Sequence, residues 1–261
     1  MEWLWSRWPD VEEKIERSEH TLLLLDYDGT LAAIAPSPEQ ATLPSSTRLV
    51  LRRLSRNPRV TVVLVSGRPL TTLRQLVRVR NLTYVGNHGL EMWHRGRRKD
   101  VLVPECSREA FSRIRPTLAG LVKDVPGARL EDKGSSLAIH YRLVRASQVA
   151  CLKAGIGHEV RPFVSSGALT VMNGKKVIEV RPCLNWTKGD ATLRLMKRVR
   201  RRSLLPIYIG DDQTDETAFR MLRGGITIRV GRHQRSKAQY YVRNVREVLR
   251  FLEWMAPVSE A

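Results

Sequence analysis

The sequence predicts an α/β protein in which a doubly wound, Rossmann-like parallel sheet forms the core and a smaller α+β domain is inserted into it. Two observations indicate this fold class. Short apolar runs alternate with amphipathic helical patterns at both ends of the chain, which is typical of parallel strands covered by helices on both faces. The middle of the chain carries several strand patterns with only two helices, which is typical of a compact α+β unit.

The N-terminal part supplies the first strands of the predicted sheet. The runs "TLLLL", "VTVVLV" and "LTYVG" are short and apolar or β-branched, and they therefore predict buried strands. The helical patterns between them make these strands parallel, because a parallel pair needs a crossover connection. In chain order, we expect a strand at 21–25, a helix near 46–55, a strand at 60–65, a helix near 69–78 and a strand at 82–86.

The same alternation returns in the C-terminal part. The expected elements there are a helix from about 188, a strand at 205–210, a helix from about 214, a strand at 225–230 and a helix near 244–254. The two stretches 1–103 and 184–261 should therefore form one core domain.

Residues 104–183 are expected to form the inserted domain. Helical patterns lie near 107–122 and 146–156. The runs "VRPFV", "ALTVM" and "KVIEV" are rich in β-branched or apolar residues, so we expect three strands, at 160–164, 168–172 and 176–180.

Composition limits the class of protein. Of the 261 residues, 42% are hydrophobic and 27% are charged, as in ordinary globular proteins. No apolar run approaches the ~20 residues that span a bilayer, and the start "MEWLWSRWPD" has no signal cleavage site, so we expect neither a membrane partner nor secretion. The three cysteines form no CxxC pair, which favours a reducing cytoplasm.

The net charge of +19 predicts an anionic partner, such as nucleic acid, a membrane surface or a phosphorylated small molecule. The densest basic run, 197–202, follows an amphipathic pattern. We interpret it as the solvated end of a helix, where cations face the negative end of the helix dipole. Only 6% of the residues are aromatic and no known nucleic-acid-binding motif is present, which argues against nucleic acid.

Polar side chains gather at the expected strand ends, where open α/β sheets bind their ligands. Asp26 and Asp28 follow the first strand, and Ser66 follows the second. Lys188 stands at the start of a helix, and the strand after that helix is followed by three aspartates, Asp211, Asp212 and Asp215. Taken singly, these are common turn and helix-start signals, but their order after apolar strands favours a catalytic site.

This set of residues predicts phosphoryl transfer with a magnesium ion. Crowded carboxylates need a cation, and Mg²⁺ prefers oxygen ligands. A lysine and a hydroxyl beside that ion would bind phosphoryl oxygens, whose charge needs compensation in the transition state. One carboxylate can attack phosphorus, and a second can protonate the leaving oxygen and later activate water. Two aspartates separated by one residue can provide both functions.

The motifs "DYDGTL", "SGR", Lys188 and "GDDQTDE" resemble, in this order, the four motifs of the haloacid dehalogenase superfamily of phosphohydrolases. The inserted domain resembles the larger α/β cap of that superfamily. Longer segments resemble its trehalose-6-phosphate phosphatase family, namely "LLDYDGTLAAIAPSP", "GNHGLE", "LEDKGSSLAIHYR", "VIEVRP", "WTKGDA" and "YIGDDQTDETAF". One position departs from the pattern, because Thr187 stands where an acidic or amide residue is common.

The resemblance implies a role for each core residue. Asp26 would be the nucleophile and a magnesium ligand, and Asp28 would be the general acid and base with its backbone carbonyl on the metal. Asp211 would complete the protein ligands, with Asp212 and Asp215 acting directly or through water. Ser66 and Lys188 would hold phosphoryl oxygens. The residues that would border the substrate on the core side are Arg68, Asn87, His88 and Glu91.

In the inserted domain, charged and amide groups would recognise the hydroxyls of the sugar. The candidates are Glu131, Lys133, Arg142 and Glu179, with Asn173 and Lys175 behind them. The alternative is that these residues form ordinary surface ion pairs of the domain.

We therefore expect magnesium-dependent hydrolysis of trehalose 6-phosphate to trehalose and phosphate through an aspartyl-phosphate, with a sugar phosphate as the small-molecule partner. One alternative is a phosphatase of the same superfamily that acts on a glucosylglycerol or mannosylglycerate precursor. Another is a basic nucleic-acid-binding or end-processing protein. Salt-dependent retention on DNA would favour that last class, whereas turnover of a free sugar phosphate would favour a phosphatase.

Overall fold

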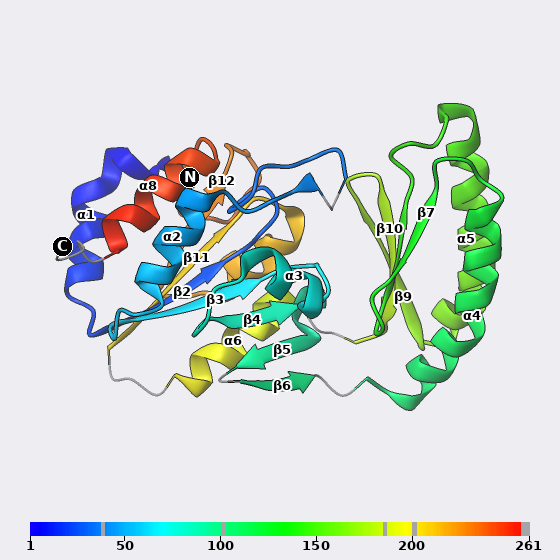
Figure 1. Cartoon of the computed structure of the whole chain (residues 1–261), viewed down its shortest axis with the longest axis horizontal. Coiled ribbons are helices and arrows are strands. Elements are labelled where there is room, and N and C mark those ends of the chain that lie inside the picture. Colours follow the sequence, from blue (N-terminus) through cyan, green and yellow to red (C-terminus); the bar gives the residue numbers. More distant parts are fainter. Residues whose placement is uncertain (38–39, 95, 101–102, 185–186, 200–202, 257–261) are drawn as a thin grey trace. The chain divides into compact units, whose positions relative to one another are not determined.

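The computed structural model describes residues 1–37, 40–94, 96–100, 103–184, 187–199 and 203–256 (Figure 1). The chain divides into two compact units. Unit 1 comprises Met1–Asp100 and Trp186–Ala261, and unit 2 comprises Val101–Asn185.

Unit 1 is built on a nine-stranded sheet in the order β1-β13-β12-β11-β2-β3-β4-β5-β6. All neighbours from β1 to β4 are parallel, and β5 and β6 add an antiparallel edge. The strands are β1 (Glu2–Trp3), β2 (His20–Leu25), β3 (Val60–Val65), β4 (Thr83–Gly86), β5 (Glu91–His94), β6 (Arg97–Asp100), β11 (Leu204–Gly210), β12 (Ile226–Val230) and β13 (Tyr240–Val242).

Helices cover both faces of this sheet (Figure 1). One face packs against α1 (Trp8–Glu16), α2 (Ser45–Leu54), α3 (Leu70–Val77) and α8 (Val245–Met255). The other face packs against α6 (Lys188–Arg198) and α7 (Glu216–Met221). Short 3₁₀ turns complete the unit at η1 (Leu4–Arg7), η3 (Asn87–Gly89) and η4 (Gln213–Asp215).

The four consecutive leucines of β2 explain this two-sided packing. Side chains alternate between the faces of a strand. Accordingly, Leu23 and Leu25 belong to the core under α2, α3 and α8, and Leu22 and Leu24 belong to the core under α6 and α7. All six residues of β2 are buried, so the strand is held from both sides.

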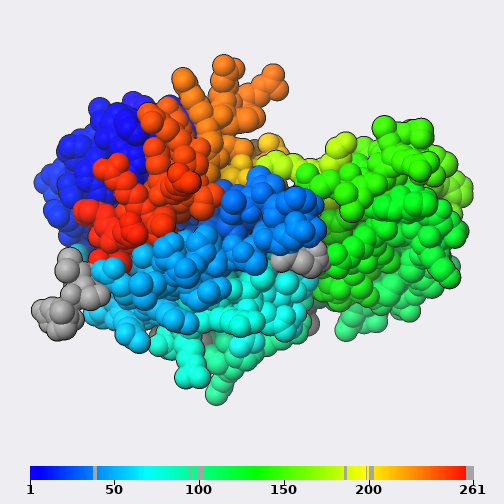
Figure 2. Space-filling model, turned by 45° about the horizontal axis from the view of Figure 1, so that its top comes forward, coloured from blue at the N-terminus to red at the C-terminus, as the bar shows by residue number. Residues whose placement is uncertain are grey.

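The N-terminal residues and α8 lie together on unit 1, where Figure 2 shows the blue and red parts of the chain side by side. The short β1 pairs with β13. The rings of Trp8 and Trp254 meet edge to face with centroids 4.7 Å apart, and Trp5 lies 4.8 Å from Trp8. These tryptophans therefore attach the start of the chain to its last helix.

Unit 2 is a four-stranded antiparallel sheet with two helices on one face. The order is β7-β8-β10-β9, formed by β7 (Arg129–Asp132), β8 (Leu137–His140), β9 (Leu169–Gly174) and β10 (Val177–Pro182). The helices are α4 (Glu105–Lys123) and α5 (Ala146–Ser165).

The predicted strand at 160–164 is wrong, because α5 continues through it to Ser165. Leu152, Ile156 and Val160 recur every four residues and are all buried in the core of unit 2. This helical stripe outweighs the β-branched composition of "VRPFV". Pro162 is tolerated near the end of the helix, where few hydrogen bonds remain to be lost.

Two other expectations concern the surface. The basic run at 197–202 begins at the end of α6, but residues 200–202 lie outside the described residues. In the described part of the chain, no helix combines the length and the apolar run needed to cross a membrane.

Candidate active site

Asp26 occupies the first position after β2, in the centre of the sheet. Its backbone N–H donates to the carbonyl of Ile209 at 2.9 Å, so the parallel ladder extends one residue beyond the strand before the chain leaves the sheet. Asp26 itself is only 4% exposed. The sequence "LLLLD" therefore delivers a carboxylate to the carboxyl edge of the sheet.

Gly29 lets the following loop pass close to a second carboxylate. Its φ is +79°, a conformation that favours glycine, and a Cβ added there would lie 2.2 Å from Oδ2 of Asp211. A side chain at position 29 would consequently displace Asp211.

Lys188 links two of the carboxylates. Its Nζ donates to Oδ1 of Asp26 and to Oδ1 of Asp215, each at 2.7 Å, and its side chain is 3% exposed. The residue is the first of α6, whose N-terminus is fixed by reciprocal bonds between Thr187 and Asp190. The threonine that departs from the family pattern thus acts as the N-cap of α6.

Asp215 accepts three hydrogen bonds. Besides Lys188, Tyr208 donates its hydroxyl to Oδ1 at 2.8 Å, and the backbone N–H of Asp212 donates to Oδ2 at 3.0 Å. Sequence reasoning missed Tyr208. The signal was a single phenol in an otherwise apolar buried strand, since a buried hydroxyl needs a partner.

Arg229 supports the loop that carries Asp211 and Asp212. Its guanidinium donates to the carbonyl of Asp211 at 2.6 Å and to that of Asp212 at 3.3 Å. Glu216 holds the same guanidinium at 2.8 Å. Sequence reasoning missed this arginine, because its position on β12 identifies it only once the sheet order is known.

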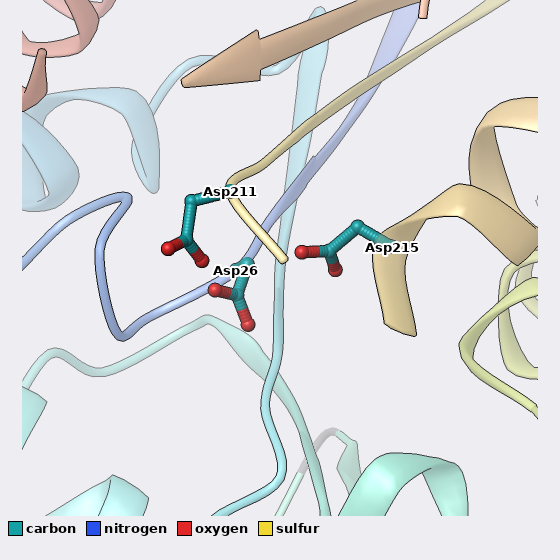
Figure 3. Close-up of side chains that lie close together, drawn as sticks. All are labelled: Asp26, Asp211 and Asp215. Carbon is teal, nitrogen blue, oxygen red and sulfur yellow. The ribbon is translucent and has the colours of Figure 1, made fainter. Parts of the chain in front are cut away.

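Three carboxylates converge at this edge, as Figure 3 shows. Asp26, Asp211 and Asp215 each offer an oxygen within 4.8 Å of the others. The carboxylates of Asp28 and Asp212 are not among these three. The resemblance assigns Asp28 to the metal through its backbone carbonyl and Asp212 directly or through water. The Asp212 side chain acts as a helix cap, in reciprocal bonds with Asp215.

The charged groups of the cluster shift one another's pKa values. Burial raises the pKa of Asp26 well above its ordinary value; Lys188 opposes this shift, whereas Asp215 and Asp211 add to it. Burial alone would lower the pKa of Lys188, but Asp215 and Asp26 hold it well above the ordinary value, so the ammonium form is retained. Three aspartate side chains thus offer oxygen atoms close to one another beside the Lys188 ammonium. A divalent cation with oxygen ligands therefore fits this site.

Asp28 pairs with Arg68 instead of joining the cluster. Nε and Nη2 of Arg68 donate to Oδ2 and Oδ1 of Asp28 at 2.8 and 2.6 Å. The Arg68 side chain is 9% exposed, whereas that of Asp28 is 42% exposed. A carboxylate held on its buried side and open on the other can meet a substrate.

The loops after β3 and β4 are joined to each other. The backbone N–H of His88 donates to the carbonyl of Ser66 at 3.0 Å, and that of Asn87 to the carbonyl of Arg68 at 2.7 Å. Asn87 and His88 both adopt positive φ, and a Cβ at Gly67 would lie 2.5 Å from the His88 ring. The structure thus brings together the predicted residues Ser66, Arg68, Asn87 and His88.

Glu91 has a contact that the sequence did not predict. Its Oε2 accepts from the backbone N–H of Leu70, the first residue of α3, at 2.8 Å, and its Oε1 lies 3.3 Å from Arg98. A carboxylate at a helix N-terminus is electrostatically favourable. These contacts place Glu91 at the start of α3.

In unit 2, three predicted sugar-binding residues belong to two close pairs, one an ion pair and the other a hydrogen bond. Nζ of Lys133 lies 2.7 Å from Oε1 of Glu179, and Nε2 of His140 lies 2.9 Å from Oε2 of Glu131. Glu131 and Glu179 both pair in register with Ala138, and they alternate with residues packed against α4 and α5. They therefore lie on the sheet face opposite the helices.

The remaining predicted residues of unit 2 lie elsewhere. Arg142 is exposed and donates to the carbonyl of Lys175 at 3.3 Å, and Asn173 is an exposed residue of β9. Sequence reasoning did not single out Arg181, which is 7% exposed and donates to the sulfur of Met172. Burial lowers the pKa of Arg181, and Glu179 opposes that shift.

Comparisons with known proteins agree with this architecture. A model of the family described as trehalose-phosphatase matches residues 24–245. A probable trehalose-phosphate phosphatase of Arabidopsis thaliana is 31% identical, with 93% of this chain and 72% of the relative covered. A trehalose 6-phosphate phosphatase of Zea mays is 30% identical, with 92% and 71% covered.

Among solved structures, the C-terminal domain of the trehalose-6-phosphate phosphatase of C. albicans superposes with a TM-score of 0.80 at 24% identity. The superposition covers 95% of this chain and 96% of that one. Together with the observed sheet order, it confirms the predicted fold class.

Proposed function

Since the chain belongs to the trehalose-phosphatase family, we propose that it releases trehalose and phosphate from trehalose 6-phosphate through a phosphorylated Asp26, with the help of Mg²⁺. Family membership makes the protein a phosphatase. The observation that carries the mechanism is the contact of Lys188 with Asp26 inside a cluster of three carboxylates, because it combines a nucleophile, a cation and oxygen ligands.

The ion would be held by the carboxylates of Asp26 and Asp211 and the backbone carbonyl of Asp28. Asp212 and Asp215 would contribute directly or through water. Once bound, Mg²⁺ neutralises charge on the phosphoryl oxygens and on the carboxylates around them.

The chain's own residues carry out two steps. An Asp26 oxygen forms a bond to phosphorus while the bond between phosphorus and the sugar oxygen breaks, and Asp28 gives that oxygen a proton. Asp28 then accepts a proton from water as the water oxygen attacks phosphorus, which frees Asp26 and forms phosphate. Ser66 and Lys188 hold the phosphoryl oxygens in both steps.

The ion pair of Asp28 leaves room for these proton transfers. Each carboxylate oxygen accepts one bond from Arg68 and keeps a second lone-pair site for the proton. We infer that Arg68 orients Asp28 while such a site gives and receives the proton.

We propose that the inserted domain, expected at 104–183, acts as a cap that recognises the sugar. Glu131, Lys133 and Glu179 share one sheet face and combine donors with acceptors, which suits a ligand rich in hydroxyls. Arg142 would contribute from the neighbouring loop.

The three free cysteines, Cys106, Cys151 and Cys183, suit a reducing compartment. We therefore propose that the enzyme acts in the cytoplasm.

Phosphate release from a panel of sugar phosphates tests the proposal. We expect trehalose 6-phosphate to give the highest kcat/KM, EDTA to abolish turnover and added Mg²⁺ to restore it. Asp26→Asn should retain essentially no activity, because an amide cannot form the phosphoenzyme. Preference for a glucosylglycerol or mannosylglycerate phosphate would transfer the assignment to that substrate. Full activity in EDTA would contradict the mechanism.

A further inference from the structure

Tyr208 is a fully buried residue of β11 that contacts the candidate active site. It is 0% exposed and stands three residues before Asp211. Its hydroxyl donates to Oδ1 of Asp215 at 2.8 Å, and its ring meets Phe219 edge to face with centroids 5.7 Å apart. The packed ring fixes where the hydroxyl points.

The hydrogen bonds of Asp215 show what this carboxylate does. Oδ1 accepts from both Lys188 and Tyr208, and Oδ2 accepts from the backbone N–H of Asp212. An ionised carboxylate has about four lone-pair sites. Among the described residues three of these sites are used, so about one is left, on Oδ2. Asp215 is therefore committed mainly to holding Lys188, and an ion could approach only Oδ2.

Tyr208 is a hydrogen-bond donor in this arrangement. Burial, followed by the charge of Asp215, raises the pKa of Tyr208 well above its ordinary value. Oδ1 of Asp215 thus accepts from the phenol as well as from Lys188.

We propose that Tyr208 is a positioning residue: its hydroxyl fixes the orientation of Asp215, which in turn holds Lys188 against the nucleophile Asp26. This inference rests on the proposed function. The terminal torsion of an aspartate is broad and has no sharp minimum. Without the phenol, the carboxylate of Asp215 can turn, and Lys188 loses the defined contact that aims it at Asp26.

Loss of the hydroxyl should change cation affinity and turnover in opposite directions. Removing a donor from Oδ1 frees a second lone pair on Asp215 and leaves its charge less compensated. Cation binding should therefore tighten while turnover slows. A general loss of folding would weaken both properties, so this opposed pair of effects is specific to the proposed role.

The test is Tyr208→Phe, with Tyr84→Phe as the matched control. Tyr84 is also buried in the sheet, 3% exposed, but its hydroxyl donates to the backbone of Val79 and not to the site. For Tyr208→Phe we expect kcat to fall about tenfold with KM changed less than about twofold, equally for trehalose 6-phosphate and p-nitrophenyl phosphate. Calorimetric titration with Mg²⁺ alone should show a dissociation constant lowered about threefold. Tyr84→Phe should leave both quantities at parent values, although it too loses a buried hydroxyl.

A kcat for Tyr208→Phe within about twofold of the parent, or an Mg²⁺ dissociation constant that is unchanged or raised, would overturn the inference. A parent enzyme that hydrolyses neither phosphate would contradict the proposed function instead. The titration needs no turnover, so in that case it still decides whether Tyr208 controls Asp215.

Discussion

Arg68 binds both carboxylate oxygens of Asp28: Nε donates to Oδ2 at 2.8 Å and Nη2 donates to Oδ1 at 2.6 Å. The two residues come from loops after neighbouring parallel strands, β2 and β3. Such a two-point bond fixes the plane of the carboxylate as well as its position. Asp28 therefore has a defined orientation before any substrate arrives, although its side chain is 42% exposed.

Replacing Arg68 by lysine tests whether this orientation matters for proton transfer. Lysine keeps the charge but cannot make the planar two-point contact. We expect kcat/KM for trehalose 6-phosphate to fall ~10-fold or more. p-Nitrophenyl phosphate, whose leaving group needs little protonation, should lose far less. Equal losses on both substrates would show that Arg68 acts on the phosphoryl group and not through Asp28.

The raised pKa of Asp26 predicts a pH-dependent cost to stability in the metal-free protein. The folded state favours the protonated carboxyl, so the stabilisation is complete below the ordinary carboxyl pKa and disappears as the pH rises through the raised value. Asp26→Asn should remove this dependence. Urea unfolding with EDTA present measures this effect. The free energy of unfolding of Asp26→Asn, relative to that of the parent, should increase as the pH rises from below the ordinary carboxyl pKa.

The stability difference between parent and Asp26→Asn isolates this one group from the other carboxyls. A difference that does not change with pH would contradict the pKa shift. Added Mg²⁺ should reduce the stability difference between Asp26→Asn and the parent at neutral pH. The reason is that the ion stabilises the ionised carboxylate of the parent more than the amide of the variant.

Arg229 predicts a second effect on metal binding. Arg229→Lys should lose the paired contacts to the carbonyls of Asp211 and Asp212 and so loosen the loop. We expect the Mg²⁺ dissociation constant, measured by calorimetry, to rise ~10-fold. Arg243→Lys, at an exposed ion pair of the same unit, is the control and should bind Mg²⁺ like the parent. Unchanged affinity in Arg229→Lys would exclude this supporting role.

The paired polar residues of unit 2 predict an effect that depends on the substrate. Glu131→Ala and Lys133→Ala should each lower kcat/KM for trehalose 6-phosphate ~10-fold or more, the scale of one or two hydrogen bonds to charged groups. p-Nitrophenyl phosphate makes no sugar contacts and should stay within a few-fold.

Asp132→Asn provides the control for this experiment. It alters the neighbouring residue of β7, whose carboxylate pairs with Arg115 of α4 at 2.7 Å. Both substrates should be unaffected. Parallel losses on both substrates in Glu131→Ala or Lys133→Ala would assign these residues to folding of the unit and not to the sugar.

The sequence was most informative where burial and polarity change abruptly. Four leucines followed by Asp26 predicted both a strand covered on two faces and a carboxylate at its end, because the same backbone position decides both. The placement of Lys188 followed from a helix start before the next strand. In each case the pattern is local, and the parallel sheet brings the strand ends together.

Contacts that depend on register or on a competing pattern were not predictable in this way. Tyr208 meets Asp215 only because β11 turns that side chain toward α6 and α7, and Arg229 reaches Asp211 only because β12 lies beside β11. Glu91 accepts a hydrogen bond from Leu70 at the start of α3, because its strand β5 runs antiparallel to β4. At 160–164 a β-branched run was misleading, because a helical stripe from earlier residues extended into it.

The position of β2 also predicts which parts of unit 1 unfold first and which unfold last. This strand is fifth among the nine of its sheet, and its amides are covered by helices on both faces. Hydrogen exchange is slowest in such segments and fastest at sheet edges and loops. The amides of Leu23 and Leu24 should therefore exchange only when the whole unit unfolds. Asp26 is attached directly to this segment, so fluctuations at the edges β1 and β6 should leave Asp26 in place.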